Sequence, residues 1–278
     1  AVGAIRNGDV TLAVVGGTEN LSRVPYFLED LRWGRRLGAV QLQDQLVVTC
    51  PHSGVARAVQ AADEAAGYGI GRLEQDEWAV RSHERYWAAF DRGFFEEIVA
   101  VDETLEGAQP LAVDESPRRG VSIDRLSGLS TVNGSTTVTA GNAPGLSTGA
   151  SAVALASHER AAEMDAPVLG SVIGNGCASG EPEQIGAMPA VAARLALDAA
   201  GVDLVDIDLI EINEAFAAVP LVTTHVLGDG DRSQIDQLRS RTNVNGGAVA
   251  LGHPTGATGA RLMMTLVASL RERGGGLG

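Results

Sequence analysis

The stretch NVNGGAVALGHPTGATGAR, from Asn243 to Arg261, places a histidine, His253, inside a glycine-rich turn. Its glycines have no side chains, so a ligand or a second backbone segment can approach the turn closely. Pro254 suits the first position of a helix, where its missing N–H is not needed. An apolar helical pattern then runs through residues 260–272. Taken alone, the turn is compatible with an ordinary loop or with a rigidly held base.

A second stretch, IEINEAFAAV from Ile210 to Val219, lies about forty residues upstream of the histidine. The strand-like run VDIDLIEI ends immediately before Asn213, and an apolar helical pattern follows it. An asparagine at such a junction can cap the helix through its side chain. It can equally point its amide into a cleft at the carboxyl end of a sheet, and the residues alone leave both interpretations open.

Together the two stretches resemble the thiolase family, which carries Asn-Glu-Ala-Phe and Gly-His-Pro-x-Gly-x-(Ser/Thr)-Gly segments at this separation. Three further segments resemble the family in the same order along the chain: Gly16–Tyr26, Tyr68–Arg85 and Thr137–Ser157. The resemblance covers nearly the whole chain. It implies an α/β fold, a thiolase-like αβαβα layered sandwich with an incomplete N-terminal half and an inserted loop domain.

The resemblance also divides the chain. Residues 1–24 and 147–166 correspond to the remainder of the N-terminal thiolase domain, 25–146 to a loop domain that covers coenzyme A (CoA), and 167–278 to the C-terminal thiolase domain. The residue patterns predict a buried strand at 11–17, a helix at 73–92, a core helix at 147–165, a strand at 168–174, a helix at 190–201, a strand at 208–212 and a helix at 214–228.

The implied activity is thiolase-type acyl transfer between acyl-CoA and CoA or acetyl-CoA, through a cysteine acyl-enzyme. The reaction is either 3-ketoacyl-CoA thiolysis or Claisen condensation, as in fatty acid and lipid metabolism. By resemblance, His253 is the base and an oxyanion donor, and Asn213 positions a water. These roles suit the residue types, because a histidine titrates near neutrality and a developing oxyanion needs preorganised donors.

Neither family cysteine has an evident counterpart in this sequence. The chain opens inside the helix that follows the nucleophile segment, and it stops at RERGGGLG, before the second catalytic cysteine. We therefore expect the cysteine segments to lie outside the chain and these residues alone not to turn over. Cys177 imitates the nucleophile segment in CASG, but its surroundings match a variable connection of the family. Cys50 is expected to be an ordinary loop residue, and both to be free thiols.

The residues expected to bind CoA depart from the family pattern. Ala56, Arg57 and Ala58 stand where the family has His-Met-Gly, and Pro144 replaces a serine that contacts pantetheine. We therefore assign no cofactor-binding residues and no metal site, and we expect CoA thioesters to act as substrates without any further cofactor. These departures keep two alternatives open, a non-catalytic thiolase-like subunit or pseudoenzyme that binds a partner or acyl-CoA, and a truncated gene with no stable product.

The composition limits the classes of molecule that this chain is expected to bind. A formal net charge of −14 disfavours nucleic-acid binding, because an acidic surface repels phosphates. The sequence has no apolar run of the roughly 18–20 residues that span a bilayer and no visible signal pattern, which predicts a cytoplasmic protein without membrane association. The family resemblance implies acyl-CoA and CoA as ligands and a homodimer or homotetramer.

All 21 basic residues are arginines. A lysine-free sequence in which Asp and Glu outnumber the basic residues suggests halophilic adaptation, since salt screens the repulsion between like charges. A lysine-poor, GC-rich genome is the alternative explanation.

Halophilic adaptation predicts that activity collapses when the salt concentration is lowered. The measurement is the rate of the native gene product across a salt series. A rate that stays constant from high to low salt would favour the genomic explanation.

Overall fold

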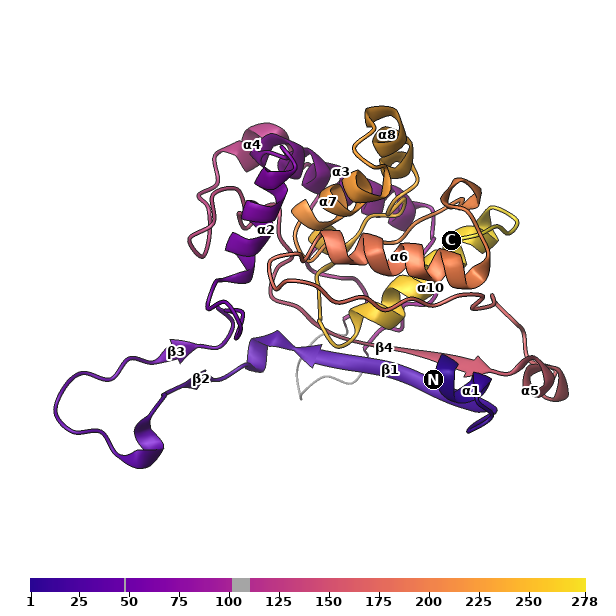
Figure 1. The fold of residues 1–278 in the computed structure, drawn as a ribbon, viewed down its shortest axis with the longest axis horizontal. Coiled ribbons are helices and arrows are strands. Elements are labelled where there is room, and N and C mark those ends of the chain that lie inside the picture. The colour runs from indigo at the N-terminus through magenta and orange to yellow at the C-terminus, as the bar shows by residue number, and fades with distance from the viewer. Residues whose placement is uncertain (48, 102–110) are drawn as a thin grey trace.

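The computed structural model describes residues 1–47, 49–101 and 111–278. Its helices and strands, in chain order, are α1 Val2–Arg6, β1 Leu12–Asn20, β2 Tyr26–Phe27, β3 Gln43–Asp44, α2 Arg57–Gly67, α3 Arg72–Asp91, α4 Ile123–Ser127, β4 Thr148–Ala156, α5 His158–Glu163, α6 Ala187–Ala200, α7 Ala218–Leu227, α8 Arg232–Ser240, α9 Ala248–Leu251 and α10 Thr258–Glu272. Figure 1 shows a long β1–β4 ribbon beneath a group of helices, with the β2–β3 segment extending away from it.

The β1–β4 ribbon is antiparallel and pairs Leu12 with Ala156 and Asn20 with Thr148. The core helix predicted at residues 147–165 is therefore wrong, because most of that segment is strand β4 and only the short helix α5 follows. Its alanines favour a helix locally, but nine residues pair with β1, and such tertiary pairing outweighs intrinsic propensity.

The strand predicted at residues 11–17 is confirmed as β1, but its predicted burial is wrong. Side chains alternate between exposed and half-buried positions along both β1 and β4. One face of the ribbon packs against α10, and Val14 on the other face is 78% exposed. The contact with the α10 side is close, since a Cβ on Gly17 would stand 1.9 Å from the Gly256 carbonyl oxygen. The absence of a side chain at Gly17 lets the β1 backbone meet the backbone of the glycine-rich turn that carries His253. The sequence predicted such a close approach for that turn.

The helices predicted at residues 73–92 and 190–201 are confirmed as α3 and α6, and the pattern at 260–272 is confirmed as α10. The strand predicted at 168–174 is wrong, because the structure assigns that segment no strand pairing among the described residues. The backbone instead passes close to α6, where a Cβ on Gly174 or Gly176 would meet a helix carbonyl oxygen at 2.4 or 2.1 Å. An extended segment becomes a strand only when another backbone pairs with it.

The strand predicted at 208–212 is wrong, because within the described part of the chain this segment forms a single bridge, between Ile210 and Thr242. Beyond that bridge, the side-chain amide of Asn243 makes the hydrogen bonds that the backbone of a neighbouring strand would make. Its Oδ1 accepts from the Ile212 N–H and its Nδ2 donates to the Ile212 carbonyl, both at 2.8 Å. A side-chain amide carries the same donor and acceptor as a peptide group, so it can satisfy the backbone here. Asn243 itself adopts a positive φ of 48°, which asparagine tolerates better than most residues.

Glu214 is the centre of a buried hydrogen-bond network and is only 1% exposed. One carboxylate oxygen accepts from Trp78 Nε1 and Asn243 Nδ2, both at 2.8 Å. The other accepts from Ser82 Oγ at 2.7 Å and from the Val249 N–H at 2.9 Å. The carboxylate thereby ties α3 to the two stretches that carry Asn213 and His253. The helix predicted at 214–228 is confirmed as α7, but α7 begins at Ala218, so Glu214 lies before the helix.

Helix α3 holds the same region with two arginines. Arg81 donates to the carbonyls of Arg239 and Thr242, and its guanidinium lies 3.7 Å from the centre of the Trp78 ring. Arg85 also donates to the Thr242 carbonyl, at 2.6 Å. These contacts place two positive charges close to the Glu214 carboxylate, which lowers the cost of burying it.

Substituting Glu214 with Gln should lower the free energy of unfolding by about 2–4 kcal/mol, because one oxygen that accepts two hydrogen bonds becomes a donor facing donors. Urea unfolding of the purified chain measures this change. The matched control is Glu163→Gln, which removes an exposed ion pair with Arg160 and should cost less than about 1 kcal/mol. Equal effects of the two substitutions would contradict the central role of Glu214.

The lowered pKa of the buried His83 makes the stability of the chain depend on pH. Its Nδ1 accepts a hydrogen bond from the Arg118 N–H, and burial, together with the Arg118 charge, lowers the pKa of His83 to about 4. Because the unfolded residue has a pKa of about 6.5, only the unfolded state takes up a proton between these values, and stability falls as the pH falls from about 6.5 to about 4.

His83→Asn keeps an acceptor for the Arg118 N–H and removes this titration. The variant should lose less unfolding free energy than the wild type over that pH interval, by up to about 3 kcal/mol, as measured by urea unfolding at each pH. The carboxylates titrate in both proteins and cancel in the comparison. Parallel stability curves for the two proteins would refute the assignment.

Candidate active site

The turn that carries His253 is fixed by its neighbours on both sides. Gly252 has a φ of +101°, and a Cβ at that position would stand 2.4 Å from Ser147 Oγ. The prediction that Pro254 begins the helix is wrong, because α10 starts at Thr258. A single turn comes first, in which the Pro254 carbonyl accepts from the N–H groups of Ala257 and Thr258. Within this turn, Gly256 lies close to the backbone of β1, since a Cβ at Gly256 would stand 2.4 Å from the Thr18 carbonyl oxygen.

The half-buried His253 is held at three atoms. Its backbone N–H donates to Ser147 Oγ at 2.9 Å. Its ring Nδ1 lies 2.7 Å from Thr258 Oγ1, and its ring Nε2 lies 3.3 Å from Asn213 Nδ2. The two residues singled out from sequence therefore meet, although forty positions separate them. Contacts at both ring nitrogens fix the orientation of the imidazole, as a base requires.

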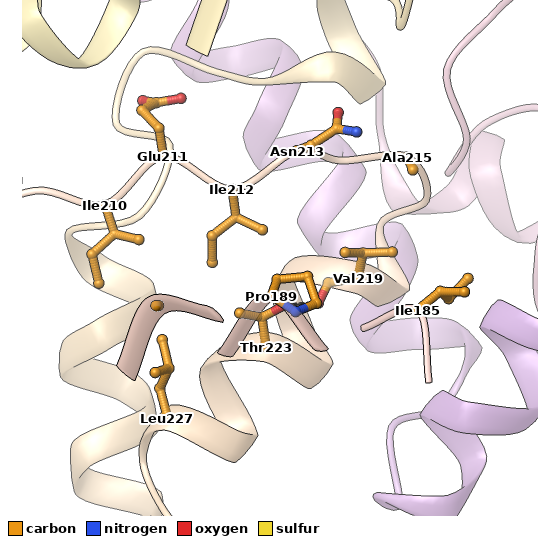
Figure 2. Close-up of a pocket in the computed structure, with 11 residues that line it drawn as sticks. Ile185, Pro189, Ile210, Glu211, Ile212, Asn213, Ala215, Val219, Thr223 and Leu227 are labelled. Carbon is orange, nitrogen blue, oxygen red and sulfur yellow. Dashed lines mark hydrogen bonds between the residues drawn. The ribbon is translucent and has the colours of Figure 1, made fainter. Parts of the chain in front are cut away.

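Asn213 does not cap a helix, since α7 begins five residues later and shows no side-chain cap. Its Oδ1 is buried and has no hydrogen-bond partner among the described residues. Figure 2 shows that the side chains of Glu211 and Asn213 point to one side of the segment, while those of Ile210 and Ile212 point to the other. This strand-like alternation aims the amide toward His253.

The isoleucine side of the segment borders a cavity of about 290 Å³ between α6, α7 and residues 210–215. Its lining is mainly apolar and includes Pro189, Val219 and Leu227 (Figure 2). The side chain of Asn213 points away from this cavity, so the apolar cavity and the polar groups around His253 lie on opposite sides of the same segment.

Burial and the nearby positive charge of Arg261 favour the neutral form of His253. Burial lowers the pKa of His253, and the positive charge of Arg261 lowers it further. The guanidinium of Arg261 is buried and makes no hydrogen bond with any described residue, as is also true of Glu211 Oε2. Burial raises the pKa of Glu211 to about 8 and outweighs the attraction of Arg261. A histidine with a lowered pKa is available as a proton acceptor at neutral pH.

The other candidate residues lie outside this cluster of contacts. Cys177 is exposed and Cys50 is buried, and both are free thiols. Hydrogen bonds from the backbone and hydroxyl of Ser53 lower the pKa of Cys50 to about 7. At the expected CoA positions, Arg57 is the first residue of α2 and donates to Gln60 Oε1 and the Pro182 carbonyl.

Sequence reasoning missed several residues around His253: Ser147, Thr258, Glu211 and Arg261. The Thr258 contact had a signal, because it is the (Ser/Thr) of the histidine motif and follows the histidine by slightly more than one helical turn. Ser147 had none, since it is 106 positions away and reaches His253 only through the β4 pairing. The burial of Arg261 and Glu211 is likewise a tertiary property.

In residues 1–47, 49–101 and 111–278, no group of three or more His, Cys, Asp or Glu side chains is arranged to hold a metal ion. Across the same residues, no helix combines the length and apolar character needed to cross a membrane.

Comparison with known proteins gives one consistent result. Family models described as thiolase N-terminal domain and thiolase C-terminal domain match residues 1–159 and 166–278. An acetyl-CoA acetyltransferase of Chromobacterium violaceum is 40% identical over 99% of this chain and 70% of its own length. The human mitochondrial 3-ketoacyl-CoA thiolase is 39% identical over 98% of this chain and 67% of its own length.

Solved structures of thiolases are similar to this chain in fold as well as in sequence. The crystal structure of the human mitochondrial 3-ketoacyl-CoA thiolase superposes with a TM-score of 0.89 at 37% identity, covering 98% of this chain and 68% of that one. A structure of the same enzyme in complex with CoA gives 0.88 over the same shares. These matches confirm the thiolase-like α/β fold expected from the sequence, and the chain belongs to the thiolase family.

Proposed function

We propose that this chain supplies the base and an oxyanion-binding group for thiolase-type acyl transfer between acyl-CoA and CoA or acetyl-CoA. The observation that carries the proposal is the meeting of His253 Nε2 and Asn213 Nδ2 at 3.3 Å, between two stretches that the Glu214 network holds together. The reaction is 3-ketoacyl-CoA thiolysis in one direction and Claisen condensation in the other.

His253 acts as the base. Its lowered pKa leaves the ring neutral, so Nε2 can take the proton of a cysteine thiol and leave a thiolate that attacks the thioester carbon. The resulting imidazolium then donates to the thioester oxygen as negative charge develops on it. The C–S bond to CoA then breaks, and the imidazolium returns its proton to the departing CoA thiolate. The Arg261 charge favours this return because it acts against protonation of the ring.

Asn213 positions a water on the thioester oxygen. Its amide Nδ2 faces the histidine, and its Oδ1 retains acceptor capacity beside the same ring. A donor fixed in advance stabilises the oxyanion without having to reorganise, and such a donor is often worth about 3–4 kcal/mol.

The nucleophile is proposed to be a cysteine outside these 278 residues. The polar contacts of His253 and Asn213 include neither Cys50 nor Cys177. The substrates are CoA thioesters, in line with the relatives named acetyl-CoA acetyltransferase and 3-ketoacyl-CoA thiolase. We further infer a homodimer or homotetramer located in the cytoplasm.

One observation favours a second candidate, a non-catalytic thiolase-like subunit. Arg57, which stands where the family has a methionine between His and Gly, is engaged within the chain by Gln60 and the Pro182 carbonyl. Pro144 cannot donate a side-chain hydrogen bond to pantetheine. A subunit of this kind binds acyl-CoA or a partner without turnover.

His253→Ala tests the proposal in the native gene product, whose intact mass first establishes whether it exceeds 28.7 kDa. Acetoacetyl-CoA thiolysis should fall by a factor of about 10²–10⁴, because a positioned general base contributes that much. The control is His158→Ala at the exposed start of α5, which should leave the rate unchanged.

Two results would count against acyl transfer. A His253→Ala variant as active as the His158→Ala control would remove the base from its proposed role. Saturable CoA binding by a wild-type protein that shows no thiolysis would instead favour the non-catalytic subunit.

A further inference from the structure

Two contacts of the Thr258 hydroxyl bear on which nitrogen of His253 carries the proton. Thr258 is 3% exposed and is the first residue of α10. Its Oγ1 lies 3.0 Å from the Pro254 carbonyl oxygen and 2.7 Å from His253 Nδ1. Because a carbonyl oxygen can only accept, the Pro254 contact is a hydrogen bond that Thr258 donates, and we assign the single hydroxyl hydrogen of Thr258 to it. Toward the imidazole the hydroxyl can then only accept, which requires Nδ1 to be protonated.

The other ring nitrogen agrees with this assignment. Asn213 presents its Nδ2, which can only donate, to His253 Nε2 at 3.3 Å. A donor at this position requires Nε2 to carry a lone pair. An imidazolium would be protonated at both nitrogens and would need the Asn213 oxygen in place of the Nδ2. Burial of the ring and the charge of Arg261 also disfavour the imidazolium. Both contacts therefore select one neutral form, with Nδ1 protonated and Nε2 free.

We propose that Thr258 is a positioning residue that holds His253 in the Nδ1–H tautomer, so that the unprotonated Nε2 faces the reaction. The relevance to catalysis rests on the proposed function, but the tautomer itself does not. When Nε2 takes a proton from a thiol, the thiol becomes a thiolate and the ring an imidazolium. The hydrogen bond from Nδ1–H to Thr258 is the same before and after this step, whereas the contact between Nε2 and Asn213 Nδ2 is given up, because both nitrogens then carry hydrogen.

His83 provides an internal reference of the opposite kind. Its Nδ1 accepts a hydrogen bond from the Arg118 N–H at 3.1 Å, so a neutral His83 carries its proton on Nε2. The same chain therefore holds two half-buried or buried histidines that should differ in tautomer because the partners of their Nδ1 atoms differ.

The experiment uses the 278-residue chain labelled with ¹⁵N at histidine, at a pH where His253 is neutral. Two-bond ¹H–¹⁵N correlations from the ring carbons distinguish the two neutral tautomers, and His253→Gln identifies the His253 signals among the five histidines. The wild type should show His253 as Nδ1–H and His83 as Nε2–H. His253 in the Nε2–H form in the wild type would overturn the proposal.

Thr258→Val removes the hydroxyl and keeps the shape of the side chain. It should convert His253 measurably to the Nε2–H form, which free histidine favours in water, whereas Thr258→Ser should restore the Nδ1–H form. The control is Thr265→Val, an equally buried threonine about 10 Å further along α10, which should change neither histidine. An unchanged His253 pattern in folded Thr258→Val would refute the role of Thr258.

The backbone amide spectrum reports whether each variant is folded. If Val at this position unfolds the chain, Thr258→Ala makes the same test without the second γ-methyl group. The readout requires neither substrate nor turnover, so it separates the two proposals. The predicted tautomer in the chain, with no thiolysis by the native gene product, would count against acyl transfer alone. Thiolysis by the native gene product, with the Nε2–H tautomer in the chain, would count against the Thr258 proposal alone.

Discussion

The Glu214 carboxylate is the interaction on which the rest of the site depends. Its two oxygens accept hydrogen bonds from α3, from Asn243 and from the Val249 backbone. A buried carboxylate is stable only when it is fully hydrogen-bonded and its charge is balanced, and the arginines of α3 supply that balance. Because its donors come from segments that are distant in sequence, satisfying one side chain fixes three parts of the chain at once. Asn213 is the adjacent residue and is placed by the same bonds.

A second constraint is the close passage of backbones around the histidine turn. Gly17 on β1 and Gly256 after His253 leave no space for a side chain between the ribbon and the turn. The ribbon also brings Ser147 beside the histidine N–H and Ser151 beside the Ala257 carbonyl. The β1–β4 pair therefore acts as a support for the site, although few of its side chains reach it.

The buried ionisable side chains of Arg261 and Glu211 make the region around His253 unusual. Buried ionisable groups without hydrogen bonds are costly and are found most often at functional sites. Here the guanidinium also acts on the histidine, because its positive charge disfavours the imidazolium. Desolvation and a nearby cation act in the same direction, and together they keep the ring in the neutral form that the Thr258 and Asn213 contacts require.

The sequence by itself determined the family and the helices α3, α6 and α10, and it singled out His253 and Asn213, which the structure brings together. These features depend on local periodicity and on motifs, which a chain displays without folding. Only the tertiary structure decided that residues 148–156 form a strand, since their alanines favour a helix until β1 pairs with them. It also decided that the Asn243 amide takes the place of a strand beside Ile212, and that Ser147, Thr258 and Arg261 surround the histidine. Contacts between distant segments, burial and the direction of a hydrogen bond have no local signal, because they exist only once the backbone has brought those residues together.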